Sequence, residues 1–222
     1  MRFKVNEIFF SIQGEGSRAG RPCLFIRLTG CPLRCVYCDT TYAFFEGEMT
    51  ELDELLAQTR ARLGPPMAGP NAPFVELTGG EPLAHPGAPA LLAALQAEGY
   101  QVALETAGSH DIGVVPAGVV KIVDRKTPGS GEEWRWLESN LGFMVSGQDE
   151  LKFVLCDQAD YAWARDWCMA RDVLGRLDVL FSPVWGRLDA TWLAEQIVRD
   201  NLPVRFQLQL HKLLWGPDRR GV

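Results

Sequence analysis

Short apolar runs alternate with segments of helical periodicity along most of this chain. Runs rich in β-branched and aromatic residues predict strands, and apolar positions that recur every three to four residues predict helices between them. The predicted strands are residues 23–28, 74–77, 102–105, 119–123, 151–155, 179–181 and 204–210. The predicted helices are residues 50–63, 89–98, 159–170 and 190–200. This alternation indicates an α/β fold wound from right-handed βα units.

The number of predicted units indicates an incomplete barrel. A closed barrel of eight βα units typically needs about 250 residues, whereas this chain has 222 residues. We therefore expect a partial, TIM-like βα barrel that forms one domain over residues 1–222. Residues 64–73, rich in proline and glycine, predict a surface loop, and residues 125–147 predict a long insert with one short helix.

Composition and charge narrow the classes of partner. The hydrophobic share of 47% is enough for a full core, and the net charge of −6 argues against a nucleic-acid partner. No apolar run is long enough to cross a bilayer and no leader opens the chain, so we expect a cytoplasmic protein without a membrane partner. The basic stretch at residues 212–220 is sparse and predicts a solvated tail.

Three closely spaced cysteines carry the strongest chemical signal. Cys31, Cys35 and Cys38 are separated by three and two residues, and Tyr37 precedes the last of them. Three thiolates on one loop suit an iron–sulfur cube in which one iron stays open for a small molecule. This pattern resembles the radical S-adenosylmethionine (SAM) superfamily, whose open iron chelates the amino and carboxylate groups of SAM.

The alternative for these cysteines is a zinc site or buried thiols. A structural zinc site usually takes four protein ligands, and the fourth would have to be Cys23 or a distant histidine. The iron–sulfur interpretation needs no fourth ligand, and we favour it. We interpret Cys23, Cys156 and Cys168, which lie in apolar or helical stretches, as packing residues.

Further polar clusters follow the predicted strands, where barrel chemistry gathers. Residues 78–82, Thr-Gly-Gly-Glu-Pro, follow one strand, and their glycines let the backbone approach a ligand closely. Glu105 ends the next strand, in reach of ribose hydroxyls or substrate nitrogens, although a solvated strand end would look the same.

A third cluster lies near the N-terminus. Gln13, within the glycine-rich residues 11–16, carries the donor and acceptor atoms that suit a pterin or purine edge, although a plain polar turn fits it too. Arg27 lies on an otherwise apolar strand, so its charge needs a partner. We expect an anionic ligand there; the alternative inside the protein is Glu15.

Taken in order, these motifs resemble the 7-carboxy-7-deazaguanine synthase family of the radical SAM superfamily. The similarity runs from residues 10–16 through Arg27, the cysteine loop with Asp39-Thr40, residues 78–82 and residues 105–108 to residues 209–212. It implies a homodimeric partial barrel that converts 6-carboxy-5,6,7,8-tetrahydropterin to 7-carboxy-7-deazaguanine with loss of ammonia. It also implies a [4Fe–4S] cluster, SAM, Mg²⁺ and a flavodoxin-like or other one-electron reductant.

The resemblance assigns roles position by position, without naming a catalytic residue. It implies that the metal ligands are Cys31, Cys35 and Cys38 for the cluster and Thr40 for Mg²⁺. It implies that the substrate contacts are Ile12, Gln13, Gly14, Glu15, Arg27, Thr78 and His211. It implies that the SAM contacts are Tyr37, Cys38, Asp39, Gly80, Glu105, Asp124, Arg125 and Lys126. Residues 123–127 depart from the Ser-Pro-Lys of many members, and the chain after His211 is longer than in compact members.

Two alternatives belong to other classes. One is a glycyl-radical-enzyme activase of the same superfamily, which would act on a partner protein and would not need Gln13, Arg27 and Thr40 together. The other is a non-enzymatic zinc-binding module held by the cysteines.

Overall fold

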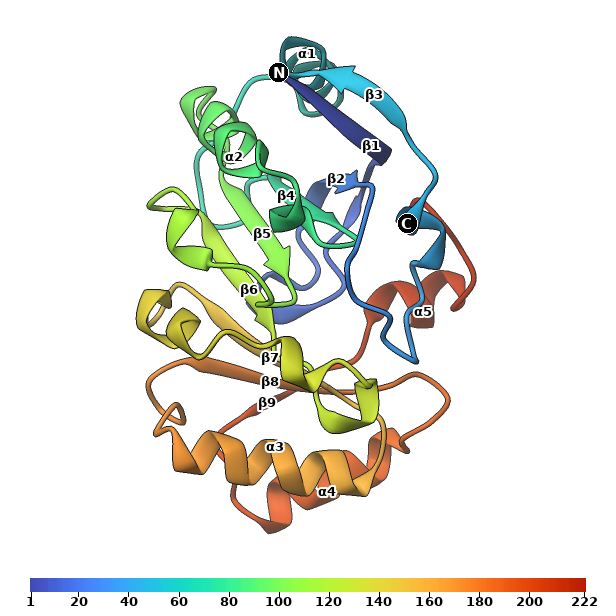
Figure 1. The fold of residues 1–222 in the computed structure, drawn as a ribbon, viewed down its shortest axis with the longest axis vertical. Coiled ribbons are helices and arrows are strands. Elements are labelled where there is room, and N and C mark those ends of the chain that lie inside the picture. The colour runs from blue at the N-terminus through green and yellow to red at the C-terminus, as the bar shows by residue number, and fades with distance from the viewer.

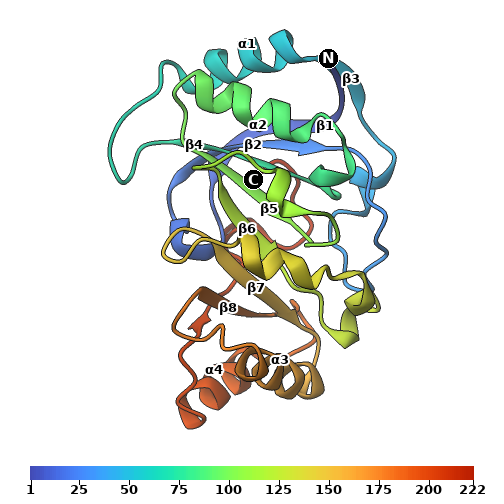
Figure 2. The same ribbon diagram turned by 60° about the vertical axis from the view of Figure 1, so that its left-hand side comes forward.

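The computed structural model describes residues 1–222, in which nine strands form one curved sheet of order β3-β1-β2-β4-β5-β6-β7-β8-β9 (Figures 1 and 2). The strands are β1 (Arg2–Ile12), β2 (Pro22–Leu28), β3 (Glu48–Glu51), β4 (Phe74–Gly79), β5 (Val102–Thr106), β6 (Val120–Asp124), β7 (Glu150–Leu155), β8 (Asp178–Pro183) and β9 (Arg205–Phe206). From β2 to β9 every neighbouring pair is parallel. The sheet does not close on itself, which confirms the predicted partial barrel.

The first and third strands were not predicted from the sequence. β1 pairs antiparallel with both β2 and β3 and widens the sheet at its N-terminal edge. Six of the predicted strands match β2 and β4 to β8 within a few residues. The prediction of a strand over residues 204–210 is largely wrong, because β9 pairs with β8 only at Arg205 and Phe206 before the chain turns into a helix.

Four helices match the predicted ones, and a fifth was missed. The helices are α1 (Leu52–Leu63), α2 (Ala88–Ala97), α3 (Gln158–Ala170), α4 (Ala190–Arg199) and the short α5 (Leu210–Trp215). Figures 1 and 2 show α1 and α2 together over the N-terminal half of the sheet, and α3 and α4 together over its C-terminal half. Asp157 and Asp189 cap α3 and α4 by accepting hydrogen bonds from backbone N–H groups of the first turn.

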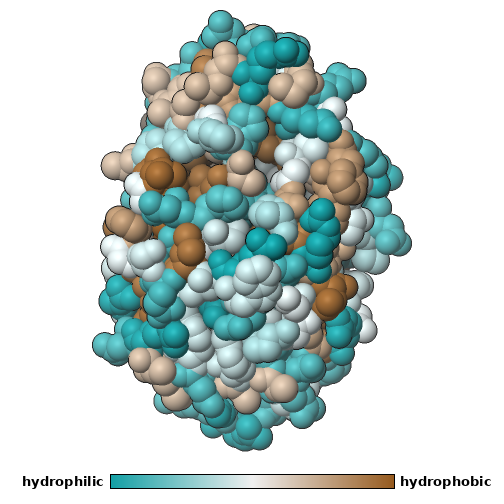
Figure 3. All heavy atoms as spheres, in the orientation of Figure 1, coloured by the Kyte–Doolittle hydropathy of each residue, from teal (hydrophilic) through white to brown (hydrophobic).

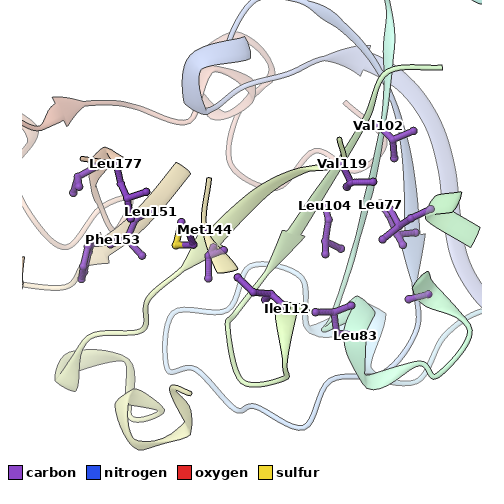
Figure 4. Close-up of a cluster of buried hydrophobic side chains, with 14 of the residues drawn as sticks. Leu77, Leu83, Val102, Leu104, Ile112, Val119, Met144, Leu151, Phe153 and Leu177 are labelled. Atoms are coloured by element: carbon purple, nitrogen blue, oxygen red, sulfur yellow. The ribbon is translucent and has the colours of Figure 1, made fainter. Parts of the chain in front are cut away.

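Successive side chains along each strand point to opposite faces of the sheet, and this places the apolar residues in two separate clusters. The main core lies between the outer face of the sheet and the helices, and Figure 4 shows part of it, including Leu77, Leu104 and Leu151 of three different strands. The inner face carries only a small apolar cluster at one end: Cys23, Phe25, Phe74, Ala103 and Ile122. Beyond this cluster the inner positions include charged residues such as Arg27, Glu105 and Lys152, so the barrel interior can hold a polar site.

The predicted insert at residues 125–147 is folded more fully than expected. It contains three short 3₁₀ helices, Pro128–Ser130, Glu133–Arg135 and Glu138–Phe143, in place of one short helix. Asn140 is fully buried, and its amide donates to the carbonyl oxygens of Gly108 and His110 at 2.9 and 3.0 Å. These bonds tie the insert to the loop after β5.

Figure 3 shows that hydrophobic residues on the face seen in Figure 1 form separate small groups among hydrophilic ones. No helix of the structure combines the length and the apolar character needed to cross a membrane.

Candidate functional site

A cavity of about 480 Å³ opens on the inner face of the sheet. Its walls come from the end of β1, the carboxyl ends of β2, β4, β5, β6 and β7, the cysteine loop and the C-terminal segment. The predicted site residues that line it are Ile12, Gln13, Gly14, Glu15, Arg27, Cys31, Cys35, Tyr37, Cys38, Asp39, Thr40, Thr78, Gly80, Glu105, Asp124, Lys126 and His211. The fold therefore brings together residues that are up to 199 positions apart, such as Ile12 and His211.

The three cysteines of the loop after β2 face this cavity as free, half-buried thiols. The loop is held from one side by the insert: the Arg34 N–H donates to Glu132 Oε1 at 2.7 Å and the Val36 N–H donates to the Ser130 carbonyl at 3.1 Å. Three free thiols on one anchored loop fit an iron–sulfur cube, whose three irons each need one sulfur.

None of the other cysteines lines the cavity, and two of them lie far from this loop. Cys23 belongs to the inner apolar cluster at the opposite end of β2. It is five residues before Leu28, which corresponds to about 16 Å along a strand. Cys168 lies in the main core, and Cys156 is buried after β7. Cys23 is therefore too far away to serve as the fourth ligand that the zinc alternative required.

The Gly79-Gly80 pair lets the end of β4 lie close to the end of β2 and to the cysteine loop. A Cβ atom on Gly80 would lie 2.4 Å from the Gly30 carbonyl oxygen and 2.6 Å from Cys31 Cβ. A Cβ atom on Gly79 would lie 2.7 Å from the Leu28 carbonyl oxygen. We expected these glycines to admit a ligand; the structure shows that they also admit the cysteine loop itself.

Glu81 of the same motif ties two strand ends together. Its buried carboxylate accepts from the Thr106 hydroxyl at 2.8 Å and from the Ala107 N–H at 2.7 Å, and its other contact is the Leu83 N–H at 3.0 Å. The motif thus fixes the ends of β4 and β5 side by side at the cavity.

The segment after β1 meets the C-terminal part of the chain. The Leu210 N–H donates to the Gly14 carbonyl at 3.1 Å, and a Cβ atom on Gly14 would lie 3.0 Å from His211 Nδ1. Gly14 is therefore needed for His211 to reach the cavity. Burial lowers the pKa of His211, and the nearby Glu15 only partly offsets that effect.

Arg27 lies at the cavity wall with a protein partner. Its Nε donates to Glu7 Oε1 at 2.8 Å, and one terminal nitrogen donates to the Gly79 carbonyl at 3.4 Å. The expected protein alternative, Glu15, is wrong: it contacts Lys152 instead. Glu7 lies on β1, which the sequence pattern did not reveal as a strand beside β2.

A layer of charged side chains separates the cavity from the apolar cluster beneath it. Lys152 lies at its centre, contacting Glu15 at 2.9 Å, Glu105 at hydrogen-bonding distance and Asp124 at 3.9 Å. Burial alone would lower the pKa of Lys152, but Glu105 and Glu15 outweigh it and hold that pKa well above its usual value. Lys152 therefore remains a cation inside the barrel.

The carboxyl groups of this layer differ in the direction in which their pKa is shifted. Burial would raise the pKa of Glu15, but Lys152 outweighs it and lowers that pKa. Burial raises the pKa of Glu105 despite its contact with Lys152, and burial together with the nearby Glu105 carboxylate raises the pKa of Glu76 well above its usual value. The sequence analysis missed Glu76 and Lys152, although both alternate with apolar residues on their strands, as inward-facing side chains do.

Residues around the expected cation ligand form a second charged group. Asp39 pairs with Lys212 at 2.6 Å and accepts from the Thr40 hydroxyl at 2.9 Å. Burial opposes ionisation of Asp39, but Lys212 outweighs it and lowers the pKa to about 2. The Thr40 hydroxyl also lines the cavity, so it is in place for a ligand role.

The prediction of a solvated tail holds only in part, because residues 213–215 and 217–221 are exposed but the segment also lies along the cavity. Lys212 is buried, residues 217–222 line the cavity, and Arg220 stacks on Tyr42 with its guanidinium carbon 3.7 Å from the ring centroid. Arg220 also pairs with Glu46 at 3.3 Å. These contacts hold the C-terminal segment across one side of the cavity.

Of the three residues Asp124, Arg125 and Lys126 at the end of β6, two face the cavity and one does not. Asp124 and Lys126 line the cavity and pair with each other at 2.7 Å. Arg125 does not reach it: its guanidinium carbon lies 4.8 to 5.4 Å from the rings of Trp136, Trp163 and Trp167 on the outer side. This corrects the expectation that Arg125 contacts a cofactor, because alternation turns the middle residue of the three outward.

Two buried polar atoms at the cavity have no partner in the protein. They are Tyr37 Oη and Asp124 Oδ1, which both belong to residues that line the cavity beside the cysteine loop. Because buried polar atoms are normally hydrogen-bonded, their position fits a polar ligand such as SAM between the cysteine loop and β6.

Sequence comparisons identify the family of the chain. The family model of the Radical SAM superfamily matches residues 25–119. The chain is 43% identical to the 7-carboxy-7-deazaguanine synthase of Chlorobaculum tepidum, an alignment that covers 98% of this chain and 96% of the relative. It is 39% identical to the synthase of the same name from Koribacter versatilis, covering 99% of this chain and all of the relative.

Structure comparisons support the fold. The crystal structure of QueE from Escherichia coli matches with a TM-score of 0.73 at 24% identity, covering 93% of this chain and 94% of that one. Streptococcus suis SuiB bound to S-adenosylmethionine matches with a TM-score of 0.52 at 13% identity, covering 80% of this chain and 48% of that one. The partial barrel is thus shared with both solved proteins.

Proposed function

Because this chain belongs to the 7-carboxy-7-deazaguanine synthase family of the radical SAM superfamily, we propose that it converts 6-carboxy-5,6,7,8-tetrahydropterin to 7-carboxy-7-deazaguanine and ammonia. This reaction belongs to the route to queuosine and other 7-deazapurines. The observation that carries the proposal is that Gln13, Arg27 and the cysteine loop line one cavity. The activase and zinc-module alternatives are not favoured by the relatives, which share the synthase name.

Three cysteines would hold the [4Fe–4S] cluster, and Tyr37, Asp39, Gly80, Glu105, Asp124 and Lys126 would surround SAM. When bound, the cluster and SAM supply a one-electron cleavage that starts radical hydrogen abstraction from the substrate. The chain's own residues bind and orient: Asp124 Oδ1 and Tyr37 Oη offer hydrogen bonds that the protein leaves unmade. The C-terminal segment limits access of water to one side of the cavity.

The substrate would lie between the charged layer and the cysteine loop. Ile12, Gln13, Gly14, Glu15, Thr78 and His211 would contact its ring, and Arg27 would bind its carboxylate. A reduced pterin carries several N–H donors, and the carboxyl groups of the layer are acceptors for such donors. The ring and this wall of the cavity are therefore chemically complementary.

Finer properties of the enzyme are part of the same proposal. We propose a homodimer in the cytoplasm that takes electrons from a flavodoxin-like or other one-electron reductant and requires Mg²⁺.

The decisive test of the proposed function is an anaerobic assay. Reconstituted enzyme, reductant, SAM, Mg²⁺ and the carboxy-tetrahydropterin are combined, and 7-carboxy-7-deazaguanine and ammonia are measured. Equal amounts of both products support the proposal. Cleavage of SAM without either product would contradict it and would direct attention to the activase alternative.

Replacing Thr40 tests the magnesium site. In Thr40→Ala the hydroxyl that lines the cavity beside Asp39 is lost, and Mg²⁺ prefers oxygen ligands. We expect the Mg²⁺ concentration for half-maximal turnover to rise at least about tenfold, with SAM binding nearly unchanged; a tenfold change corresponds to about 1.4 kcal/mol. Thr191→Ala, at an exposed threonine of α4 that does not line the cavity, is the control. Superimposable Mg²⁺ curves for Thr40→Ala and parent would remove Thr40 from the metal site.

Replacing Arg27 tests the carboxylate contact. A charge-assisted hydrogen bond is worth about 1.5–3 kcal/mol, so Arg27→Ala should raise the KM for the pterin roughly ten- to hundredfold and spare the cluster. Glu7→Gln is the matched control, because it removes the charge of the protein partner of Arg27 and keeps the guanidinium. If Arg27→Ala binds the substrate as well as the parent does, Arg27 serves only its ion pair with Glu7.

A further inference from the structure

Glu76 is a buried carboxyl group of the cavity whose contact with another side chain the proposed function does not use. It lies on the inner face of β4, between Phe74 of the inner apolar cluster and Thr78 at the cavity wall. Only 1% of its surface is exposed, and it lines the cavity. Its one side-chain hydrogen bond is to Gln13, whose Nε2 donates to Glu76 Oε2 at 2.5 Å.

The groups facing Glu76 include one cation, Lys152, but it does not contact the Glu76 carboxyl group. They are Glu15 after β1, Cys23 on β2, Glu105 on β5, and Glu150 and Lys152 on β7. Lys152 contacts Glu15 and Glu105, and neither a lysine nor an arginine contacts Glu76. An uncompensated charge inside a protein is costly, so the uncharged carboxyl is favoured there, in agreement with its raised pKa.

Glu76 and the backbone of Glu15 hold the two ends of the Gln13 amide. The Glu15 N–H donates to Gln13 Oε1 at 3.1 Å, while Gln13 Nε2 points to Glu76. A flipped amide would bring its NH₂ group against the Glu15 N–H. The orientation is thus set, and one N–H and one lone pair of the amide stay available to a ligand in the cavity.

We propose that Glu76 is a positioning residue that determines substrate specificity by fixing the Gln13 amide in this one orientation. The available donor and acceptor of a fixed amide match a ring edge that offers a carbonyl acceptor beside an N–H donor. They do not match an edge that offers an amino donor beside a bare nitrogen acceptor. The ring edge of the oxo-pterin is of the first kind, and the ring edge of its 4-amino analogue is of the second kind. This step rests on the proposed function.

The test compares the KM for 6-carboxy-5,6,7,8-tetrahydropterin with the inhibition constant of its 4-amino analogue in the reconstituted enzyme. We expect the parent to prefer the oxo compound at least about tenfold. Glu76→Leu should raise the KM about tenfold with little change in kcat, and its preference should fall below about threefold. Glu76→Gln, which keeps an uncharged acceptor for Gln13, should retain the preference of the parent.

A double-mutant cycle separates this role from a general effect on folding. If Glu76 acts through Gln13, adding Glu76→Leu to Gln13→Ala should not raise the KM further. Thermal stability and iron content are measured on every variant. Additive losses, an unchanged preference in Glu76→Leu, or a loss of preference in Glu76→Gln would overturn the inference while the parent remains active. A parent that makes no deazapurine overturns the proposed function, and this inference with it.

Discussion

Cys35→Ala should lose the [4Fe–4S] cluster and, with it, all SAM cleavage. One iron of the cube would lose its only protein ligand, and the cavity offers no replacement thiol, because no cysteine other than Cys31, Cys35 and Cys38 lines it. The measurements are iron and sulfide content after anaerobic reconstitution, the brown absorption of the cluster, and formation of 5′-deoxyadenosine. We expect SAM cleavage to fall below the detection limit, a larger effect than that of any single binding residue.

The matched control is Cys168→Ser, a cysteine of the same chain that packs in the main core. It should keep near-normal iron content, although burial of a hydroxyl in an apolar site is expected to reduce stability by about 1–3 kcal/mol. If reconstituted Cys35→Ala cleaves SAM at the rate of the parent, the cluster assignment is wrong. Loss of iron in Cys168→Ser would show instead that Cys168 was wrongly assigned as a packing residue and is needed for the cluster.

The sequence was sufficient for the parts of the site that are local. The cysteine spacing, Gly79-Gly80 and most of the parallel strands are visible in short windows, and the structure places them around one cavity. The polar inner face of the sheet could also have been predicted from the alternation of residues along the strands. Glu76 and Lys152 alternate with apolar residues, but a charge on a buried strand has no visible partner until the strands are placed next to one another.

The parts that were missed depend on contacts between distant segments. β1 became apparent only through its antiparallel pairing with β2, and this pairing puts Glu7 beside Arg27. The basic stretch at residues 212–220 was interpreted as a solvated tail because its charges are too sparse for a binding groove, whereas Lys212 and Arg220 pair with Asp39 and Glu46 more than 170 residues earlier. No local pattern encodes such pairings, so tertiary structure is needed to reveal them.

Replacing Lys152 should produce the largest loss of stability. In Lys152→Met the buried ammonium group is removed while the half-buried Glu15 and Glu105 are left beside an apolar side chain. Breaking a buried ion pair by removing one partner typically costs about 3–5 kcal/mol. For a domain of this size we expect the unfolding midpoint to fall by roughly 10 °C at pH 8. Lys4→Met is the control, because the ammonium of Lys4 is exposed and contacts only a backbone carbonyl.

The pH dependence of that loss identifies its cause. Without Lys152, burial should raise the pKa of both Glu15 and Glu105 in the folded state above the unfolded value, so the folded variant binds more protons than the unfolded chain. Stability of Lys152→Met should then rise as the pH falls from 8 towards 5, because ∂ΔG/∂pH is negative when the folded state holds more protons. In the parent the lowered pKa of Glu15 acts in the opposite direction: that stabilisation is present above the unfolded pKa of Glu15 and is lost as the pH falls through the folded one.

The difference in unfolding midpoint between parent and variant should therefore shrink on acidification, and Lys152→Met/Glu105→Gln should recover part of it at pH 8. A difference that stays constant between pH 5 and 8 would mean that Lys152 stabilises the barrel through the packing of its methylene chain, and that the charged layer is not held together by its cation.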